Sequence, residues 1–321
     1  MKNTLPMTLL AQLDDVAVFQ TAAFSDIDYA SIDISRSKIN QQPHQRQQAS
    51  YGELNLGLHV NDDASVVLSN RMRVLATINE QMIAQQNLPV HSVPVKALHW
   101  VNQVHGNDIH DTDATVLSMA PMAADAMVSK QDGTGLAIMT ADCVPIVLYQ
   151  PATGQIAAIH AGWQGLACGV IKATAERFSD SGEIMAWIGV CISQDNYEVG
   201  SQVRDKLLAG CIANNALTTD AISNFNERYV MASGTRELDA ASTADKLSNN
   251  TPVYAEKIKI DLPKIAADQL RAVGIVVCNE SSIPCSYADG HYYSYRRQTH
   301  LQQAATGRMA LIITRSASIY N

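Results

Sequence analysis

The sequence has few basic residues and almost no clusters of them. Lys and Arg number 23 against 31 Asp and Glu, which gives a formal net charge of −8, and the only pronounced basic pair is Arg296-Arg297. An acidic chain without a basic patch is a poor partner for nucleic acid or for an anionic membrane. We therefore expect small-molecule ligands and neither nucleic-acid nor membrane partners. Composition leaves the oligomeric state open.

Signals for export, membrane insertion and disulfide cross-linking are also missing. The first 20 residues hold one lysine and a short apolar run broken by Asp14 and Asp15, which is unlike a secretory signal. Apolar stretches end well short of the roughly 18 residues that suggest a membrane-spanning helix. The six cysteines are widely spaced, which favours free thiols or metal ligands over disulfides: residues 143, 168, 191, 211, 278 and 285. We expect a cytoplasmic protein.

Apolar runs alternate with stretches of helical spacing along most of the chain. With 47% hydrophobic residues, the 321-residue chain can bury a large core. Strands are predicted within 97–106, 125–130, 135–150, 155–163, 183–192 and 310–315, and helices within 165–180, 197–210 and 259–274. This alternation predicts an α/β fold. No long linker is visible, so we expect one domain over residues 1–321, with an exposed Gln-rich segment near 35–50 and a surface insertion near 233–252.

Three possible metal ligands stand at the ends of apolar strands: His105, Cys143 and His160. Their separations of 38 and 17 residues (143 − 105 and 160 − 143) are too long for a local zinc knuckle. Neighbouring strands of one sheet can still bring such residues to a shared edge. Two imidazoles and a thiolate suit zinc with an open fourth position, and copper would also bind them. A buried structural cysteine and two turn histidines are the alternative.

Several short motifs occur in a recognisable order: "QVHG", "DAMV", "TADCVPIVL", "AIHAGWQG", "YEVG" and "YYSYRRQ…ATGRMALII", with "GELNLGLHVNDD" upstream. From about Gly52 to the C-terminus the chain closely resembles the YfiH family, also named the laccase-domain or multicopper polyphenol oxidase family. The resemblance implies a single α/β domain with layered mixed β-sheets flanked by helices. It also implies a metal site made by His105, Cys143 and His160. Gln164 and Val190 stand where the family pattern has arginine and proline.

The resemblance further implies a purine nucleoside enzyme that phosphorolyses adenosine, inosine and methylthioadenosine and deaminates adenosine. Zinc suits deamination because it lowers the pKa of bound water to about 7. The proton shuttle would be Asp142 or Asp125, although an aspartate at a strand end is commonly a turn or capping residue. Phosphate and nucleoside need donors and stacking partners, for which the candidates are Asn55, Arg71, Gln103 and Arg296, with Tyr292, Tyr293 and Tyr295 as aromatic candidates that could equally pack a core edge.

Three other functions stay open at this point. Cys143 could be a nucleophile with His160 as its base, in an amidohydrolase that acts on an amide or a cell-wall precursor, because the family shares its fold with Cys-His deamidase toxins. A copper-dependent polyphenol oxidase is disfavoured because the chain has nine histidines and no His-x-His pair, the usual ligand source of a laccase cluster. A zinc-stabilised domain that only binds a partner is the non-enzymatic alternative.

Overall fold

The computed structural model describes residues 5–25, 48–85, 93–114, 121–238 and 254–317. In these ranges three sheets are formed. The five-stranded sheet has the order β1 (Met7–Leu13), β2 (Val16–Thr21), β14 (Met309–Arg315), β6 (Thr134–Thr140) and β3 (Ala97–His99). The six-stranded sheet has the order β13 (Val276–Val277), β9 (Met185–Ile188), β7 (Val144–Gln150), β8 (Gln155–Ala161), β5 (Ala126–Ser129) and β4 (Ile109–Asp111). The three-stranded sheet has the order β10 (Glu198–Gly200), β12 (Tyr254–Ile260) and β11 (Val230–Leu238).

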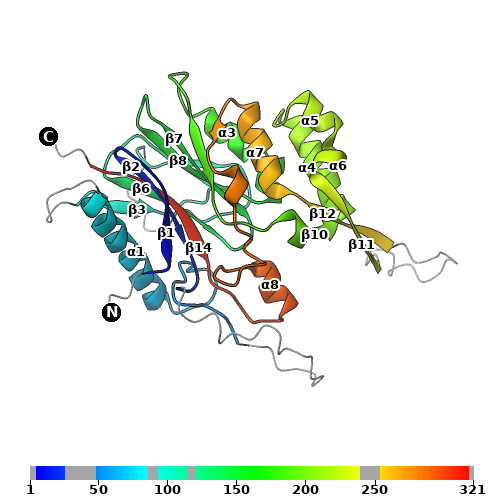
Figure 1. The fold of residues 1–321 in the computed structure, drawn as a ribbon, viewed down its shortest axis with the longest axis horizontal. Coiled ribbons are helices and arrows are strands. Elements are labelled where there is room, and N and C mark those ends of the chain that lie inside the picture. The colour runs from blue at the N-terminus through cyan, green and yellow to red at the C-terminus, as the bar shows by residue number, and fades with distance from the viewer. Residues whose placement is uncertain (1–4, 26–47, 86–92, 115–120, 239–253, 318–321) are drawn as a thin grey trace.

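The helices of the described ranges flank these sheets (Figure 1). They are α1 (Ala64–Gln85), α2 (Trp163–Ala167), α3 (Val170–Ala175), α4 (Ser201–Ala213), α5 (Thr219–Ser223), α6 (Phe225–Tyr229), α7 (Leu262–Ala272) and α8 (Tyr295–His300), with 3₁₀ turns η3 (Gln194–Asn196) and η5 (Glu280–Ser282). Parallel pairing joins β3 to β6, β4 to β5 and β13 to β9, and the remaining strand pairs are antiparallel. The predicted fold class, α/β with layered mixed sheets, is confirmed.

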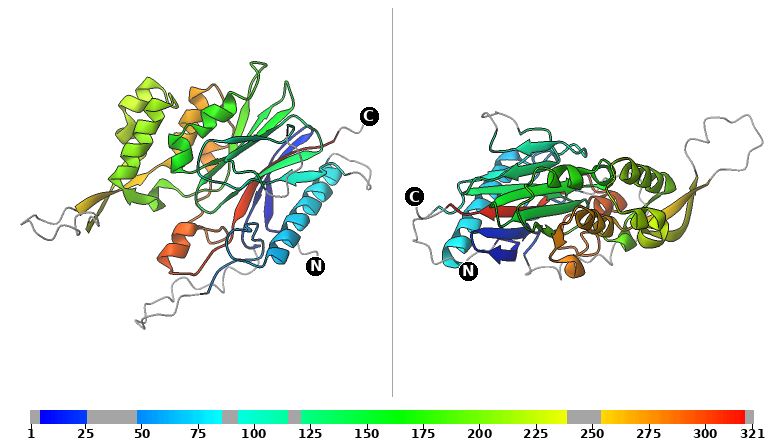
Figure 2. Two further views of the ribbon diagram at one scale, coloured as in Figure 1. Left: turned by 180° about the vertical axis from the view of Figure 1, so that it is seen from behind. Right: turned by 90° about the horizontal axis from the view of Figure 1, so that it is seen from above.

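The two larger sheets pack face to face, with helices on their outer faces (Figures 1 and 2). Between the sheets, Leu136 and Ile313 of the five-stranded sheet share a core with Val147 and Ile156 of the six-stranded sheet. A second core joins α1 to the outer face of the five-stranded sheet. A third core joins the outer face of the six-stranded sheet to α2, α3 and α7.

This layering explains the unbroken apolar character of the predicted strands. In β7, Val147 points into the core between the sheets, while its neighbours Ile146 and Leu148 point into the core beneath the helices. Successive side chains of a strand face opposite sides, so a strand that is covered on both sides needs apolar residues at every position. Every residue of β5, β6, β7 and β8 is buried.

The predicted helices are shorter than their sequence patterns. The segment 165–180 contains two short helices, α2 and α3, because Gly169 between them adopts a left-handed backbone with φ 74°. The segment 197–210 begins with strand β10 before α4, and the segment 259–274 begins with the end of β12 before α7. In both segments a strand with apolar residues at strand spacing is followed closely by a helix. The boundary between strand and helix was therefore not visible in the sequence.

The N-terminal elements were not predicted. Helix α1 buries Val67, Asn70, Val74, Ile78 and Met82 along one face, a helical spacing that is visible in the sequence. Strands β1 and β2 add an antiparallel pair at one edge of the five-stranded sheet.

Two predicted surface segments fall partly outside the described residues. Residues 35–47 lie outside them, and Ser50 pairs in an isolated bridge with Thr306. The predicted surface insertion near 233–252 begins within strand β11, whose Arg236, Glu237 and Leu238 pair with β12. Residues 239–253 lie outside the described ranges, so the insertion stays a prediction. No helix of the described chain is long and apolar enough to cross a bilayer.

Candidate metal centre

The three predicted ligands come together where the chain passes between the two large sheets. Residues 141–143 connect β6 of the five-stranded sheet to β7 of the six-stranded sheet, and Cys143 is the last of them. His160 lies in β8, where it pairs with Pro145 of β7, and His105 lies in the loop between β3 and β4. One ligand atom from each of the three residues lies within 4.8 Å of the others. The prediction that the fold brings His105, Cys143 and His160 together is therefore met.

The geometry of this cluster fits one small cation. Cys143 Sγ lies 4.0 Å from His105 Nε2, and the rings of His105 and His160 are edge-on, with centroids 4.7 Å apart. Tetrahedral zinc with bonds of about 2.3 Å to sulfur and about 2.0 Å to nitrogen holds such atoms roughly 3.5 Å apart. Only a small closing movement separates the observed arrangement from that geometry. The donor set suits zinc, and the same ligands also accept copper.

Asp125 holds both histidines through hydrogen bonds. Its Oδ1 lies 2.8 Å from His160 Nδ1 and accepts the backbone N–H of His105 at 2.9 Å, while Oδ2 accepts the N–H of Gly106 at 2.6 Å. The residue is completely buried. Burial alone would raise the pKa of Asp125, but the hydrogen bonds from His160 and Gly106 outweigh it and lower the pKa. The contact leaves His160 Nε2 free to face a metal, as outer carboxylates do in many metal sites.

Asp142, the other predicted proton shuttle, anchors the start of α8. Its Oδ1 accepts the Ser286 hydroxyl at 2.7 Å and its Oδ2 accepts the N–H of Arg296 at 2.6 Å. Its backbone φ of 111° is rare for a residue with a side chain, so these contacts hold a strained conformation beside Cys143. Burial raises the pKa of its carboxyl despite the hydrogen bonds. The anchoring function matches the capping alternative, and the catalytic assignment stays a prediction.

Gly162 makes room for the ligands. A Cβ atom at this position would lie 3.1 Å from Cys143 Sγ and 3.3 Å from His105 Cδ2. Any larger residue would therefore push against two of the three ligands at once. The small residue directly after the histidine strand is explained by this close approach.

The cluster lies in a cavity of about 540 Å³. This volume falls within the range of pockets for small organic ligands. Besides the three ligand residues, its lining combines aromatic, cationic and polar side chains, among them Trp163, Tyr197, Tyr295, Arg296, Arg308, His59, Gln103 and Asp142. Such a mixture can bind a flat polar heterocycle together with an anion.

Two of the four predicted substrate-binding residues line this cavity. Gln103 does so while its amide pairs with the backbone of Met139, donating at 2.7 Å and accepting at 2.9 Å. Arg296 donates to the carbonyl of Glu198 at 2.6 Å, and its guanidinium carbon lies 5.4 Å from the centroid of the Tyr197 ring. Both side chains are thus held in place by neighbouring protein groups.

The other two predicted residues are not among the described lining of the cavity. The Arg71 guanidinium stacks 4.2 Å from the Trp100 ring and donates to the carbonyl of Leu56, and burial lowers its pKa to about 10. Asn55 is buried, donates to Asp62 at 2.8 Å and accepts the N–H of Arg308 at 2.9 Å. Their contacts are structural, and direct substrate binding by either residue stays a prediction.

The three tyrosines near α8 differ in environment. Tyr293 is buried and its hydroxyl donates to the carbonyl of Tyr51, so it packs the core. Tyr292 is partly buried against the same core. Tyr295 is 57% exposed and lines the cavity, which leaves it as the tyrosine of this group that can stack on a ligand. Gln164, where the family pattern has arginine, is exposed in α2.

Sequence reasoning missed the aromatic, imidazole and guanidinium side chains of four lining residues: His59, Trp163, Tyr197 and Arg308. All four stand in or beside the motifs that carried the family resemblance, so their position in those motifs was the available signal. Arg308 immediately precedes β14 and comes from the far end of the chain, and no local spacing links it to His105.

Cys143 and His160 shift one another's pKa strongly. Burial would raise the pKa of Cys143, but His160 and His105 outweigh it and lower the pKa to about 6. Burial would lower the pKa of His160, but Cys143 and Asp125 raise it to about 9. A thiolate beside an imidazolium is ready to bind a cation by releasing a proton, and it is also the resting state of a Cys-His nucleophile.

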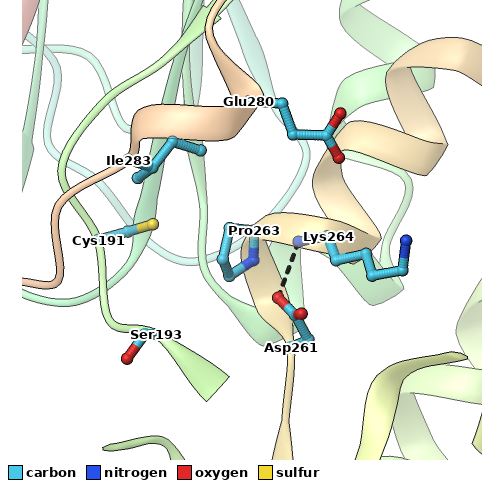
Figure 3. A pocket seen from close by; sticks show the side chains of 7 residues that line it. All are labelled: Cys191, Ser193, Asp261, Pro263, Lys264, Glu280 and Ile283. Atoms are coloured by element: carbon cyan, nitrogen blue, oxygen red, sulfur yellow. Dashed lines mark hydrogen bonds between the residues drawn. The ribbon is translucent and has the colours of Figure 1, made fainter. Parts of the chain in front are cut away.

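A second, smaller cavity of about 250 Å³ lies elsewhere and contains none of the three candidate metal ligands (Figure 3). It is lined by Cys191, Ser193, Asp261, Pro263, Lys264, Glu280 and Ile283. Asp261 caps α7 by accepting the N–H of Lys264 at 3.0 Å, and burial raises the pKa of Cys191 well above its usual value. A protonated thiol and a capping carboxylate give this cavity no evident chemistry.

Together, the fold and the cluster define a layered α/β protein with one His-Cys-His site in the described chain. The family model described as multi-copper polyphenol oxidoreductase laccase matches residues 41–233 and 226–316, and the chain belongs to this family.

Similar proteins include purine nucleoside phosphorylases. The purine nucleoside phosphorylase YfiH of Escherichia coli K12 is 32% identical over 265 residues, which cover 82% of this chain and 86% of that protein. A purine nucleoside phosphorylase of Pseudomonas aeruginosa is 29% identical over 268 residues, covering 83% of this chain and 87% of that protein.

Among solved structures, the Neisseria meningitidis protein NMB0706 aligns with a TM-score of 0.63 and 26% identity, covering 97% of this chain and all of that one. Bacillus licheniformis YfiH aligns with a TM-score of 0.63 at 22% identity, covering 98% and 97% of the two chains, which supports the fold alone.

Proposed function

We propose that this chain is a purine nucleoside phosphorylase with one zinc ion bound by His105, Cys143 and His160. The main support is the His-Cys-His cluster, which lies in a cavity that is also lined by two arginines and several aromatic rings. The names of the bacterial relatives support the activity. Adenosine, inosine and methylthioadenosine are the proposed nucleosides, and phosphate is the proposed co-substrate.

In phosphorolysis a phosphate oxygen bonds to the anomeric carbon of the ribose while the bond from that carbon to the purine nitrogen breaks. The electron pair leaves with the purine, which takes up a proton. A bound zinc ion would supply a Lewis acid that stabilises developing negative charge. The chain must bind the phosphate, orient the nucleoside and exclude competing water.

The cavity offers side chains for these tasks. Tyr295, Tyr197 and Trp163 provide aromatic surfaces against which a purine can stack. Arg296 offers a guanidinium that can bind an oxyanion, with its position fixed by the carbonyl of Glu198. Asp125 keeps the His160 ring oriented, so the ligand cluster is in place before substrate arrives.

Adenosine deamination is the second activity that we propose for the same site. Water adds to the purine carbon that bears the amino group, and ammonia leaves after proton transfer. Asp142 is the better of the two predicted proton shuttles, because it lines the cavity whereas Asp125 is engaged behind His160. Burial raises the pKa of its carboxyl, which is the direction that favours proton transfer by a carboxyl group.

One observation favours a different enzyme class. The lowered pKa of Cys143 beside His160 is typical of a cysteine nucleophile, so a Cys-His amidohydrolase is the second candidate function. Zinc binding would argue against it, because a metal-bound thiolate is a weak nucleophile. Copper in place of zinc is the remaining alternative for the metal, since the family description names copper.

The cellular setting forms part of the proposal. All six cysteines are free, which suits a reducing compartment. We therefore place the enzyme in the cytoplasm, where nucleosides and inorganic phosphate are both present.

The deciding experiment combines metal analysis with a nucleoside screen. Protein purified without added metal should contain close to one zinc per chain, and it should release purine base from nucleosides only when phosphate is present. Release of ammonia from adenosine without phosphate would report deamination. Four coppers per chain together with phenol oxidation would overturn the proposal, as would full activity after verified removal of metal.

A further inference from the structure

Arg308 is held rigidly where it lines the cavity. Its backbone N–H donates to Asn55 Oδ1 at 2.9 Å, and its Nη1 donates to the carbonyls of Thr306 at 3.1 Å and Gly307 at 2.9 Å. Gly57 leaves space for its stem, because a Cβ there would lie 2.8 Å from Arg308 Cγ. The guanidinium is therefore positioned before any ligand binds, which lowers the entropic cost of binding.

Among the described residues, the charge of this guanidinium has no ion-pair partner. Within the described residues, no carboxylate lies within 4.0 Å of Arg308. Burial lowers its pKa, only partly opposed by the more distant charges of Cys143 and Asp142. Both oxygens of Asp142 already accept hydrogen bonds from Ser286 and Arg296. A partly buried cation without a counter-ion is costly for the unliganded protein and favours binding of an anion.

The groups around Arg308 favour binding of a small oxyanion from solution. His59 lines the same cavity, and its pKa is lowered by burial and by the positive charges of Arg308 and Arg71. The cluster of His105, Cys143 and His160 lines the cavity as well. A phosphate that binds Arg308 thus shares one cavity with the proposed metal and with a nucleoside. Arg71, which the sequence suggested for this task, is instead covered by Trp100.

We propose that Arg308, with the imidazole of His59 beside it, forms the subsite that binds inorganic phosphate as the co-substrate. This proposal rests on the proposed phosphorolysis for the fate of the phosphate, but the binding site itself does not. Two oxygens of the phosphate would accept from Nε and Nη2 of Arg308, the nitrogens that make no hydrogen bond within the described protein. Arg296 then remains available to the nucleoside side of the cavity.

The test compares inorganic phosphate binding by zinc-loaded full-length variants. Titration calorimetry should show that Arg308→Gln weakens phosphate binding by about tenfold or more, as expected for loss of a charge-assisted pair of hydrogen bonds. Arg308→Lys should lose about threefold or more, because an ammonium keeps the charge but not the fork. Arg73→Gln is the matched control: it removes one positive charge on the exposed side of α1 and should change binding less than about twofold.

Steady-state kinetics distinguishes phosphate binding by Arg308 from a purely structural function of this residue. In Arg308→Gln the KM for phosphate should rise about tenfold, while the KM for the nucleoside and the zinc content stay near those of the wild type. If the Gln variant does not fold, Arg308→Lys decides, with its melting temperature as the check on folding. Unchanged phosphate affinity in a folded Arg308 variant would overturn the subsite even if phosphorolysis is real.

The second source of phosphate chemistry is a nucleotide. If adenosine 5′-monophosphate binds in an Arg308-dependent manner while inorganic phosphate does not bind, the co-substrate assignment is wrong. If the wild type binds phosphate through Arg308 but cleaves no nucleoside, the subsite stands and the proposed phosphorolysis fails. The two proposals therefore fail in distinguishable ways.

Discussion

Asp125 Oδ1 lies 2.8 Å from His160 Nδ1, and the same oxygen accepts the backbone N–H of His105 at 2.9 Å. One buried carboxylate thus fixes the ring of one candidate ligand and the backbone of another. His105 has a φ of 64°, a conformation that costs energy in a residue with a side chain, and the contacts to Asp125 hold it there. The cluster is therefore organised by a residue that does not itself belong to it.

Replacing Asp125 with Asn should weaken zinc binding while leaving all three ligands in the chain. The amide group keeps only one acceptor oxygen, so either the Oδ1 contacts to His160 and His105 or the Oδ2 contact to Gly106 are lost. Loss of an outer carboxylate typically costs about 10- to 100-fold in metal affinity. Competition with a chromophoric chelator measures the change. Asp205→Asn on an exposed helix position is the control, and equal zinc affinity in the two variants would contradict the positioning function.

Gly162→Ala should disturb the site sterically. The added methyl group would lie 3.1 Å from Cys143 Sγ and 3.3 Å from His105 Cδ2, so the ligands must move apart or the strand end must shift. Zinc affinity should fall while the melting temperature of the metal-free protein changes little. Gly106→Ala is the matched control, because its new methyl group would meet nothing closer than 3.6 Å. A variant at 162 that binds zinc like the wild type would show that the cluster tolerates expansion.

The sequence was sufficient to predict the layered fold because buried strands leave a clear signal. Runs such as 144–150 are apolar at every position, and this pattern occurs where both faces of a strand are covered. Helix α1 was not predicted although Val74, Ile78 and Met82 follow helical spacing, because the polar residue Asn70 interrupts the apolar face. The boundary between β10 and α4 was missed because β10 is only three residues long, Glu198–Gly200, and α4 begins at the next residue.

The site was predictable to the extent that it depends on residues at strand ends. Cys143 directly precedes β7 and His160 lies near the end of β8, where strand ends meet at a sheet edge, whereas His105 lies in the loop between β3 and β4. Which groups the two aspartates contact depends on tertiary contacts: Asp125 turns inward to His160, and Asp142 is held by Ser286, 144 residues further along the chain. Arg308 lines the cavity from the position just before the last strand, and only the folded chain shows this.

Zinc affinity should depend on pH in a defined window. In the metal-free protein the pKa of Cys143 is about 6 and that of His160 is about 9, so between these values the thiolate is formed while the imidazole carries a proton. Zinc must displace that proton from His160, so affinity should rise about tenfold per pH unit as pH increases from 6 toward 9. Below pH 6 the fall should steepen, because Cys143 must then also lose a proton.

Calorimetry in buffers of different ionisation enthalpy measures this proton release directly. Near pH 7.5, these two residues should together release about one proton for each zinc bound. Asp125→Asn should lower the pKa of His160, because the Asp125 contact is one of the causes that raise it, and should reduce the proton release. Zinc binding without proton release would mean that His160 is already neutral in the metal-free site.

Substitution of Cys143 separates the two enzyme classes. In the zinc enzyme, Cys143→Ser replaces a soft thiolate by a hydroxyl that stays protonated. Zinc affinity should therefore fall by more than about 100-fold, the largest loss typical of residues that only hydrogen-bond a metal ligand. Metal content and nucleoside phosphorolysis should fall together, and excess zinc should restore part of both. Cys143→Asp should retain more zinc than Cys143→Ser, because aspartate still offers a negative ligand.

If Cys143 is a nucleophile, both the zinc-rescue experiment and the aspartate variant should give the opposite result. Neither zinc nor aspartate can replace an attacking sulfur, so no rescue would occur, and the wild type would survive a chelator but not a thiol alkylating agent. For the zinc enzyme, chelation should abolish activity, and bound zinc should protect Cys143 from alkylation because its sulfur electrons are engaged by the metal. Cys168, which is exposed, serves as the internal control, since its alkylation should not depend on zinc. Zinc-independent alkylation of Cys143 together with full activity after metal removal would assign the site to the Cys-His class.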